Sequence, residues 1–161
     1  MTNSKIAQVL KDDRWSLADG HTDAGPYIIR FRTPVLCPPD TAGYPERLTI
    51  LWPYAEENSG ALPSDADTAA LEQFEDRLCA ALEHDAHAIV TAVLTFDGAR
   101  QWVVYTSDFR ECGERIGAMP QNDEPYPIEM RADDDPDWRY LREQILRRVQ
   151  PNAQPPLSPD V

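Results

Sequence analysis

The stretch 88–108 constrains the fold of this 161-residue chain most strongly, because it reads as two strands joined by a tight turn. The apolar runs 88–96 and 101–106 flank Asp97-Gly98, a dipeptide that favours a two-residue hairpin turn. Such a turn needs positive φ at both central residues, which Asp tolerates and Gly adopts without steric cost. The first run is apolar on both faces, so we expect this hairpin to form the centre of a sheet covered on both sides.

Four more stretches read as strands from their alternation or their β-branched and aromatic content. They are residues 14–18 (ended by Asp19-Gly20), 26–32, 46–54 and 126–131. Pro127 lies within the last of them and cannot donate a hydrogen bond to a neighbouring strand, which indicates a sheet edge. Residues 33–45 and 55–63 are predicted to be loops.

Three helices are predicted. The clearest runs from Ser64 to about His84, with acids in its first turns and apolar residues at three- and four-residue spacing. The second covers 108–119, where Asp108 and Glu111 match a capping box. The third covers 135–149 and starts with Asp-Pro-Asp, which combines a capping side chain with a proline at the first helical position. The lead-in before residue 14 is expected to hold one helical turn at most.

From residue 46 the predicted elements follow the order βαββαβ and then a helix, which is the ferredoxin-like plan. We therefore expect one α+β domain over 1–150, with an antiparallel sheet, an N-terminal strand extension and a C-terminal helix. The proline-rich stretch 151–161 is expected to be a disordered tail.

In the ferredoxin-like plan the strand 88–96 lies at a sheet edge, where so apolar a strand invites aggregation. The strand 26–32 could pair with it, or a second copy of the chain could form a homodimer through this edge. An arrangement with 26–32 beside 46–54 is also open.

The amino-acid composition indicates which kinds of partner the protein could bind and in which compartment it lies. The chain carries 28 acidic and 15 basic side chains, a net charge of −13, which disfavours a nucleic-acid or anionic-membrane surface and suits a protein partner with a basic surface. Three cysteines without a CxxC motif suggest a reducing compartment. The sequence shows no apolar signal core and no run of about 20 apolar residues, so we expect a cytoplasmic protein.

Five segments together resemble the bacterial family called domain of unknown function 695, over roughly residues 14–148. They are LTILWPY at 48–54, LPS at 62–64, AVLTFDGARQWVVYTSD at 92–108, YPIEM at 126–130 and DDDPDWRYL at 133–141. The resemblance implies a bacterial cytosolic α+β domain, distantly like the regulator-of-ribonuclease-E-activity-B type of domain, an acidic inhibitor, and so implies regulation by protein binding. The family has no established activity, so it assigns no catalytic residues.

The densest set of carboxylates consists of Asp133, Asp134, Asp135 and Asp137, which could supply oxygens to a hard cation. A calcium loop needs a glycine for its sharp turn, and Trp138 stands in that place. Helix capping and a solvated acidic turn are sufficient to explain these residues, so we predict no metal site.

Two further patterns suggest reactive chemistry. Cys79, His84 and His87 have the spacing C-x4-H-x2-H, but zinc sites are usually tighter and need four ligands. Cys112 lies in the first turn of a predicted helix, where backbone N–H groups can lower the pKa of a thiol. We expect structural roles for all four residues, with no catalytic residue and no cofactor.

Aromatic and basic side chains have ordinary explanations too. Core packing or a lined groove accounts for the strand aromatics Tyr27, Trp52, Tyr54, Trp102 and Tyr105. A solvated outer helix face accounts for Arg139, Arg142, Arg147 and Arg148, which lie beside the acidic stretch 123–137.

The sequence thus predicts a non-catalytic protein-binding or regulatory module with an acidic surface. The alternative is a small-molecule-binding protein or hydrolase-like enzyme, with a pocket between the sheet and the loops 33–45 or 55–63.

Overall fold

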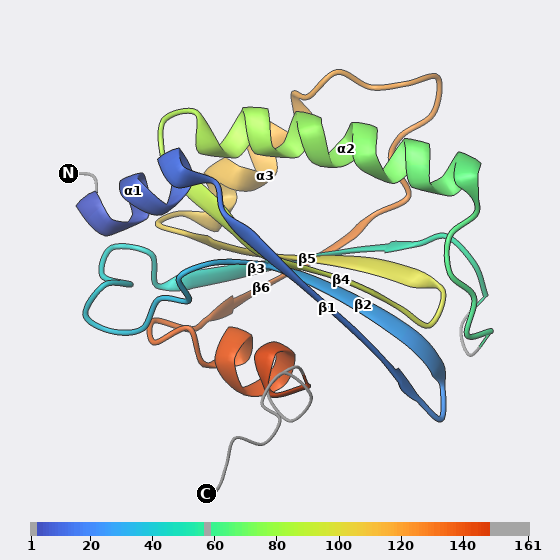
Figure 1. Cartoon of the computed structure of the whole chain (residues 1–161). Helices are drawn as coiled ribbons and strands as arrows, with labels where there is room; N and C mark the ends of the chain where they lie inside the picture. The colour runs from blue at the N-terminus through green and yellow to red at the C-terminus, as the bar shows by residue number, and fades with distance from the viewer. Residues whose placement is uncertain (1–2, 57–58, 149–161) are drawn as a thin grey trace, which may run out of the picture.

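The computed structural model describes residues 3–56 and 59–148, which form a six-stranded antiparallel sheet with helices on both faces (Figure 1). The strands are β1 (Trp15–Thr22), β2 (Gly25–Arg32), β3 (Glu46–Pro53), β4 (Ala88–Phe96), β5 (Ala99–Thr106) and β6 (Glu129–Asp134). The helices are α1 (Ser4–Asp12), α2 (Asp65–Glu83) and α3 (Phe109–Gly117), followed by a C-terminal helical segment of one π-helix, η1 (Tyr140–Ile145), and one 3₁₀ turn, η2 (Leu146–Arg148).

The strand order is β1-β2-β4-β5-β3-β6, so the β4–β5 hairpin lies at the centre of the sheet, as predicted. The predicted α+β class and antiparallel sheet are confirmed. Of the arrangements left open, β2 pairs with β4, and the meander that placed β2 beside β3 is wrong. Because β4 is an interior strand, it offers no free edge to a second copy of the chain; the sheet edges are β1 and β6.

The turn of the central hairpin consists of Asp97 and Gly98, whose φ angles are 51° and 82°. A side chain on Gly98 would place its Cβ 2.8 Å from the carbonyl oxygen of Glu56, so this position requires glycine for space as well as for φ. β5 begins at Ala99, two residues earlier than predicted, because Phe96 and Ala99 pair directly across the two-residue turn.

A β-bulge in β4 explains why this run looks apolar on both faces. The pairing register with β5 shifts between Val90 and Ala92, and the hydroxyl of the extra residue, Thr91, donates to the Val103 carbonyl oxygen at 2.9 Å. The alternation of side chains between the two faces of the sheet is therefore reversed after the bulge. Apolar side chains are consequently needed at both odd and even positions, and all of β4 except Phe96 is buried.

The sheet separates two hydrophobic cores. The α2/α3 core, above the sheet in Figure 1, contains Leu71, Phe74, Leu78 and Leu82 of α2 and Cys112 and Ile116 of α3. The opposite core is covered by α1, by residues of the 33–45 loop and by the C-terminal helical segment, through Ile6, Leu36, Trp138, Leu141 and Ile145. All five strand aromatics named above lie in or against these cores.

Asp108 caps α3 as predicted, but the predicted capping box with Glu111 does not form, whereas α2 does begin with a capping box. Ser64 and Asp67 form a reciprocal capping box at α2. At α3, the Asp108 carboxylate accepts from the backbone N–H groups of Arg110 and Glu111, while the Glu111 side chain binds Arg115 and not the cap.

The N-terminal elements are longer than predicted. β1 continues through Asp19-Gly20 and turns only after Thr22, because Gly20 pairs with Tyr27 and makes room for its ring: a Cβ there would lie 2.4 Å from the Tyr27 hydroxyl oxygen. The lead-in forms the nine-residue helix α1, which buries Ile6 and Val9.

The last two elements begin later than predicted. β6 starts at Glu129, not residue 126, and includes Asp133 because Arg47 on the adjacent strand neutralises it. The Asp-Pro-Asp sequence forms a turn, and the helix begins only at Tyr140, because Trp138 takes a left-handed φ of 58° that no α-helix allows. The stretch 149–161, predicted in part to be a tail, lies outside the described residues.

Within the described ranges, no helix combines the length and apolar character that crossing a membrane requires.

The α2/α3 core predicts the effect of truncating Leu78, which is fully buried. Leu78→Ala should lower the free energy of unfolding by about 3 kcal/mol, because it removes apolar contacts and leaves a cavity. Leu17→Ala is the control: Leu17 is 65% exposed on β1, and its truncation should cost about 0.5 kcal/mol or less. Urea denaturation measures both; similar losses for the two variants would contradict the assignment of Leu78 to a core.

Candidate functional site

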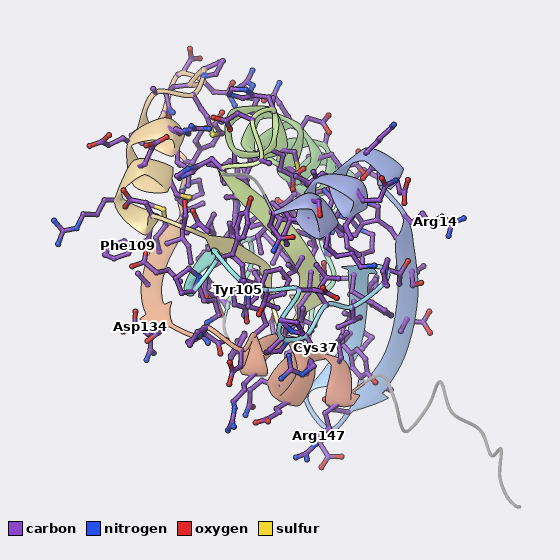
Figure 2. All side chains as sticks on the ribbon, turned by 90° about the vertical axis from the view of Figure 1, so that its left-hand side faces the viewer. Arg14, Cys37, Tyr105, Phe109, Asp134 and Arg147 are labelled. Carbon is purple, nitrogen blue, oxygen red and sulfur yellow. The ribbon has the colours of Figure 1, made fainter. Side chains whose placement is uncertain are left out.

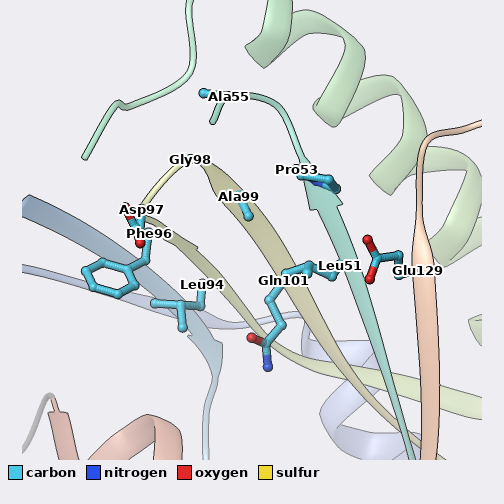
Figure 3. Close-up of a pocket in the computed structure, with 10 residues that line it drawn as sticks. All are labelled: Leu51, Pro53, Ala55, Leu94, Phe96, Asp97, Gly98, Ala99, Gln101 and Glu129. Carbon is cyan, nitrogen blue, oxygen red and sulfur yellow. The ribbon is translucent and has the colours of Figure 1, made fainter. Parts of the chain in front are cut away.

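Within residues 3–56 and 59–148, no element covers part of the sheet on the side of the C-terminal helical segment. Two adjoining hollows lie there, with volumes of about 440 and 380 Å3, and they share Leu51, Gln101 and Glu129. The first is lined by Leu51, Pro53, Ala55, Leu94, Phe96, Asp97, Gly98, Ala99, Gln101 and Glu129 (Figure 3). The second is lined by Arg47, Thr49, Leu51, Gln101, Glu129, Met130, Arg131, Asp133 and Tyr140. We call the two together the sheet-face trough.

Strand register explains how the trough is built. Leu94 of β4 pairs with Gln101 of β5, Gln101 pairs with Leu51 of β3, and Leu51 pairs with Glu129 of β6. Directly opposite residues of neighbouring strands point to the same face, so these four side chains form one row across four strands. The row runs from an apolar end on β4 to a carboxylate on the edge strand.

The polar groups of the trough are few and separate. The Gln101 side-chain amide donates to the Tyr140 hydroxyl at 2.7 Å, which positions this amide between the two hollows. Asp97 accepts from the backbone N–H of Gly60 at 3.2 Å, and Glu129 is exposed on β6. Within the described ranges, neither carboxylate has a cationic side chain at ion-pair distance.

One end of the trough rests on a buried polar cluster around Asp135. Its carboxylate accepts from the Tyr105 hydroxyl at 2.6 Å, from the Arg47 guanidinium at 3.0 Å, and from the backbone N–H groups of Arg139 and Tyr140 at 2.9 and 3.1 Å. Burial by itself raises the pKa of this carboxyl, but these hydrogen bonds outweigh burial and hold the pKa below its usual value. Asp135 therefore caps the C-terminal helical segment and binds it to the sheet.

Arg47 and Tyr105 complete the cluster. Arg47 also donates to Asp133 at 2.9 Å, and its guanidinium lies 4.1 Å from the centre of the Tyr140 ring. Tyr105 stacks on Trp138 with ring centres 4.4 Å apart, and burial followed by its bond to Asp135 raises the pKa of its hydroxyl. Figure 2 shows Tyr105 in the middle of the molecule and Asp134 on the outside. Of the aspartates considered as metal ligands, Asp133 and Asp135 thus bind the same guanidinium, whereas Asp134 lies on the outside.

Cys79, His84 and His87 are not brought together as a metal site. No three His, Cys, Asp or Glu side chains of residues 3–56 and 59–148 are placed to share an ion. Cys79 lies against Glu83, and burial, then the charges of Glu83 and Glu75, raise the pKa of its thiol.

Cys112 does lie near a histidine, but indirectly. Its thiol and the His87 Nε2 approach the same hydroxyl, that of Thr106, at 3.3 Å each, and this hydroxyl is fully buried. Burial raises the pKa of the Cys112 thiol to about 11. A thiol that stays protonated at neutral pH is a poor nucleophile, so this arrangement suits a packing role.

The opposite face of the sheet carries buried ion pairs that the alternation of residues 26–32 did not reveal. Arg32, predicted to be on a half-exposed strand face, is buried and binds the Glu83 carboxylate, Asp13 and the Val90 carbonyl oxygen. Arg30 forms a two-point bond with Glu75. These contacts hold α2 against β2, and both arginines have carboxylate partners.

The trough residues were missed because alternation assigned them to the outward face of their strands. In 46–54 the alternation predicts that Leu48, Ile50, Trp52 and Tyr54 point inward. The trough residues of β3 are the alternate positions Arg47, Thr49 and Leu51. The basic helix face is placed as expected, with Arg139 and Arg147 exposed, whereas the side chain of Arg148 lies outside the described residues.

Asp135 yields a test by pH. Asp135→Asn should lower the free energy of unfolding by about 2 kcal/mol at pH 7, because a neutral amide replaces the carboxylate that accepts from Tyr105, Arg47 and two backbone N–H groups, while Arg47 keeps its ion pair with Asp133. The pKa of Asp135 is depressed in the folded state, so its contribution is present above the unfolded pKa of about 3.9 and is lost as pH falls through the folded value. Urea unfolding of both proteins should give curves that converge below pH 4; a constant gap down to pH 2 would refute the role.

The cysteines predict a graded thiol reactivity. Cys37 is exposed, whereas Cys79 and Cys112 are shielded and have raised pKa values. A disulfide reagent at pH 8 should modify one thiol quickly and the other two only after denaturation. Cys37→Ser should abolish the fast phase; a fast phase that survives in this variant would mean that another thiol is accessible.

The comparisons with known proteins agree with the motifs. No curated protein matches the chain. A family model described as a family of unknown function, DUF695, matches residues 13–145, which include every residue that lines the trough. The match covers more than half of the sequence and contains all five motif segments. The chain belongs to the DUF695 family.

Proposed function

We propose that this protein is a non-catalytic, cytoplasmic binding module that engages a protein partner with a basic surface. The observation that carries the proposal is the first hollow of the sheet-face trough, a recessed surface next to an edge strand. Its two carboxylates, Asp97 and Glu129, have no cationic side chain at ion-pair distance within the described residues, whereas Asp133 in the second hollow is paired with Arg47 and Arg131. The net charge of −13 would steer a basic partner towards the first hollow.

The arrangement of reactive groups supports a binding role over a catalytic one. Asp135, Tyr105 and Glu83 are engaged in contacts that join helices to the sheet. The thiol of Cys112 is buried with a raised pKa. None of these groups lies at the first hollow, which holds about 440 Å3 and is the larger part of the trough.

Affinity capture tests the proposal. The purified protein is immobilised, incubated with lysate of its source cells at about 50 and 500 mM salt, and the retained proteins are identified and purified. We expect a reproducible partner with a basic surface, bound more weakly at high salt because salt screens charge pairs. Glu129→Lys should weaken binding of the purified partner, whereas the control Glu72→Lys, an equal charge change on the exposed face of α2, should not. A partner held without salt dependence, or no reproducible partner, would contradict the proposal.

The first hollow also supports the second candidate, a small-molecule-binding protein or hydrolase-like enzyme. Its volume falls in the range of ligand pockets, and Ala55 of the 55–63 loop lines it. A thermal-shift screen of metabolites distinguishes the two candidates: a compound that raises the melting temperature of the wild type but not of Ala99→Phe, which fills the hollow, would favour this function.

We infer further that the segment from β3 to β6 follows the ferredoxin-like plan. What supports this is the strand order β6-β3-β5-β4, which is 4-1-3-2 in chain order, with α2 and α3 as the two connections. The likeness to regulator-of-ribonuclease-E-activity-B type domains stays a prediction.

A homodimer through the edge strand β1 is also proposed, because Leu17 on this strand is exposed. Light scattering tests it by comparing the mass of Leu17→Arg with that of the wild type.

A further inference from the structure

We propose that the sheet-face trough receives an extended segment of the partner in which an aliphatic residue is flanked, two positions away on each side, by arginine or lysine. This inference rests on the proposed function and specifies where the partner binds and which chemistry it presents. It follows from the row of side chains across the sheet and from the charges at the two sides of that row.

The floor of the first hollow is suited to one aliphatic side chain. Leu51, Leu94 and Ala99 present apolar atoms from three adjacent strands, and Phe96 closes the hollow on the β4 side. Figure 3 shows Leu94 and Gln101 projecting from neighbouring strands on the same side of the sheet. Burial of a leucine-sized side chain on such a floor is favourable in proportion to the apolar area removed from water.

A carboxylate stands on each side of this floor. Asp97 lies in the β4–β5 turn and Glu129 on the edge strand β6, and both line the hollow. Asp97 accepts one backbone hydrogen bond and Glu129 accepts none within the described residues, so both can receive a charge-assisted hydrogen bond from an incoming cation. The two carboxylates favour cationic groups on both sides of an apolar one.

The spacing of the row fits an extended peptide. Leu94 and Glu129 are separated by three steps between neighbouring strands, which is about 14 Å. In an extended chain, alternate side chains on one face are about 6.6 Å apart, so residues i and i+4 span about 13 Å. Asp97 lies in the turn, three residues beyond Leu94, so the segment would lie diagonally across the strands, and the long side chains of arginine or lysine would cover the remaining distance to the two carboxylates.

A third hollow among the described residues suits the same segment less well. It lies between α2 and α3, has a volume of about 440 Å3, and is lined by small apolar residues together with Arg77, His84 and Arg115. A basic segment would meet two arginines and no lining carboxylate there, although Arg115 is itself paired with Asp85 and Glu111. The first hollow of the trough is lined by two carboxylates and no basic side chain, so the basic segment is favoured there over the hollow between α2 and α3.

A pair of peptides tests the inference. Fluorescently labelled Arg-Ser-Leu-Ser-Arg and Arg-Ser-Ser-Ser-Arg are titrated with the full-length protein at low salt, and binding is followed by fluorescence polarisation. The leucine peptide should bind about fivefold more tightly than the serine peptide, because only leucine buries apolar area on the floor.

Matched variants locate the site. Asp97→Asn/Glu129→Gln should weaken binding of the leucine peptide about tenfold, because it removes two charge-assisted bonds while asparagine keeps the turn conformation. Glu72→Gln/Asp76→Asn makes the same charge change on the exposed face of α2 and should leave binding unchanged. Ala99→Phe should abolish the preference for leucine, and the single variant Glu129→Gln replaces the double variant if that fails to fold.

Two results would overturn the inference. Equal weakening by both double variants would mean that net charge alone attracts the peptide, and the general proposal of an acidic binding surface would survive. Absence of binding to the wild type would also overturn it, and the capture experiment, which uses no peptide, would then decide the general proposal separately.

Discussion

The carboxylate of Asp135 is the point on which the C-terminal half of the structure depends. It joins three segments far apart in the sequence: Tyr105 on β5, Arg47 on β3, and the first backbone N–H groups of the C-terminal helical segment. Without this carboxylate the buried Tyr105 hydroxyl would lose its partner and Arg47 would keep only Asp133, and loss of a partner is costly for a buried polar group. The cluster therefore fixes the position and direction of the last helix with respect to the sheet.

The open trough is a consequence of this anchoring. The helical segment starts at Tyr140, beside β3 and β5, and packs Leu141 and Ile145 against the core beneath β4. It is too short to cover the rows nearer the Asp97-Gly98 turn. The sheet surface between that turn and β6 is consequently left as a recess, with Gln101 tied to Tyr140 at its border. The contacts of Asp135 thus both anchor the C-terminal helical segment and determine which part of the sheet this segment leaves open.

The sequence predicted those features that depend on local chemistry, such as the Asp97-Gly98 hairpin and the caps of α2 and α3. It did not predict the bulge at Thr91, because a strand buried on both faces carries no alternation that a shift could interrupt. It placed β6 too early, because Asp133 is acceptable in a strand only with Arg47 beside it, which is a long-range contact. The trough was hidden for a similar reason: whether the outward face of β3 is covered depends on where the last helix ends.

Amide hydrogen exchange in the variant Tyr105→Phe tests the role of Asp135 most directly, because it removes one hydrogen bond of the cluster and keeps the ring stacked on Trp138. The account predicts that protection of amides in η1 falls severalfold while amides in α2 and β4 keep theirs, since local opening is confined to the segment that the cluster anchors. Unchanged protection of η1, or an equal loss throughout the sheet, would contradict it.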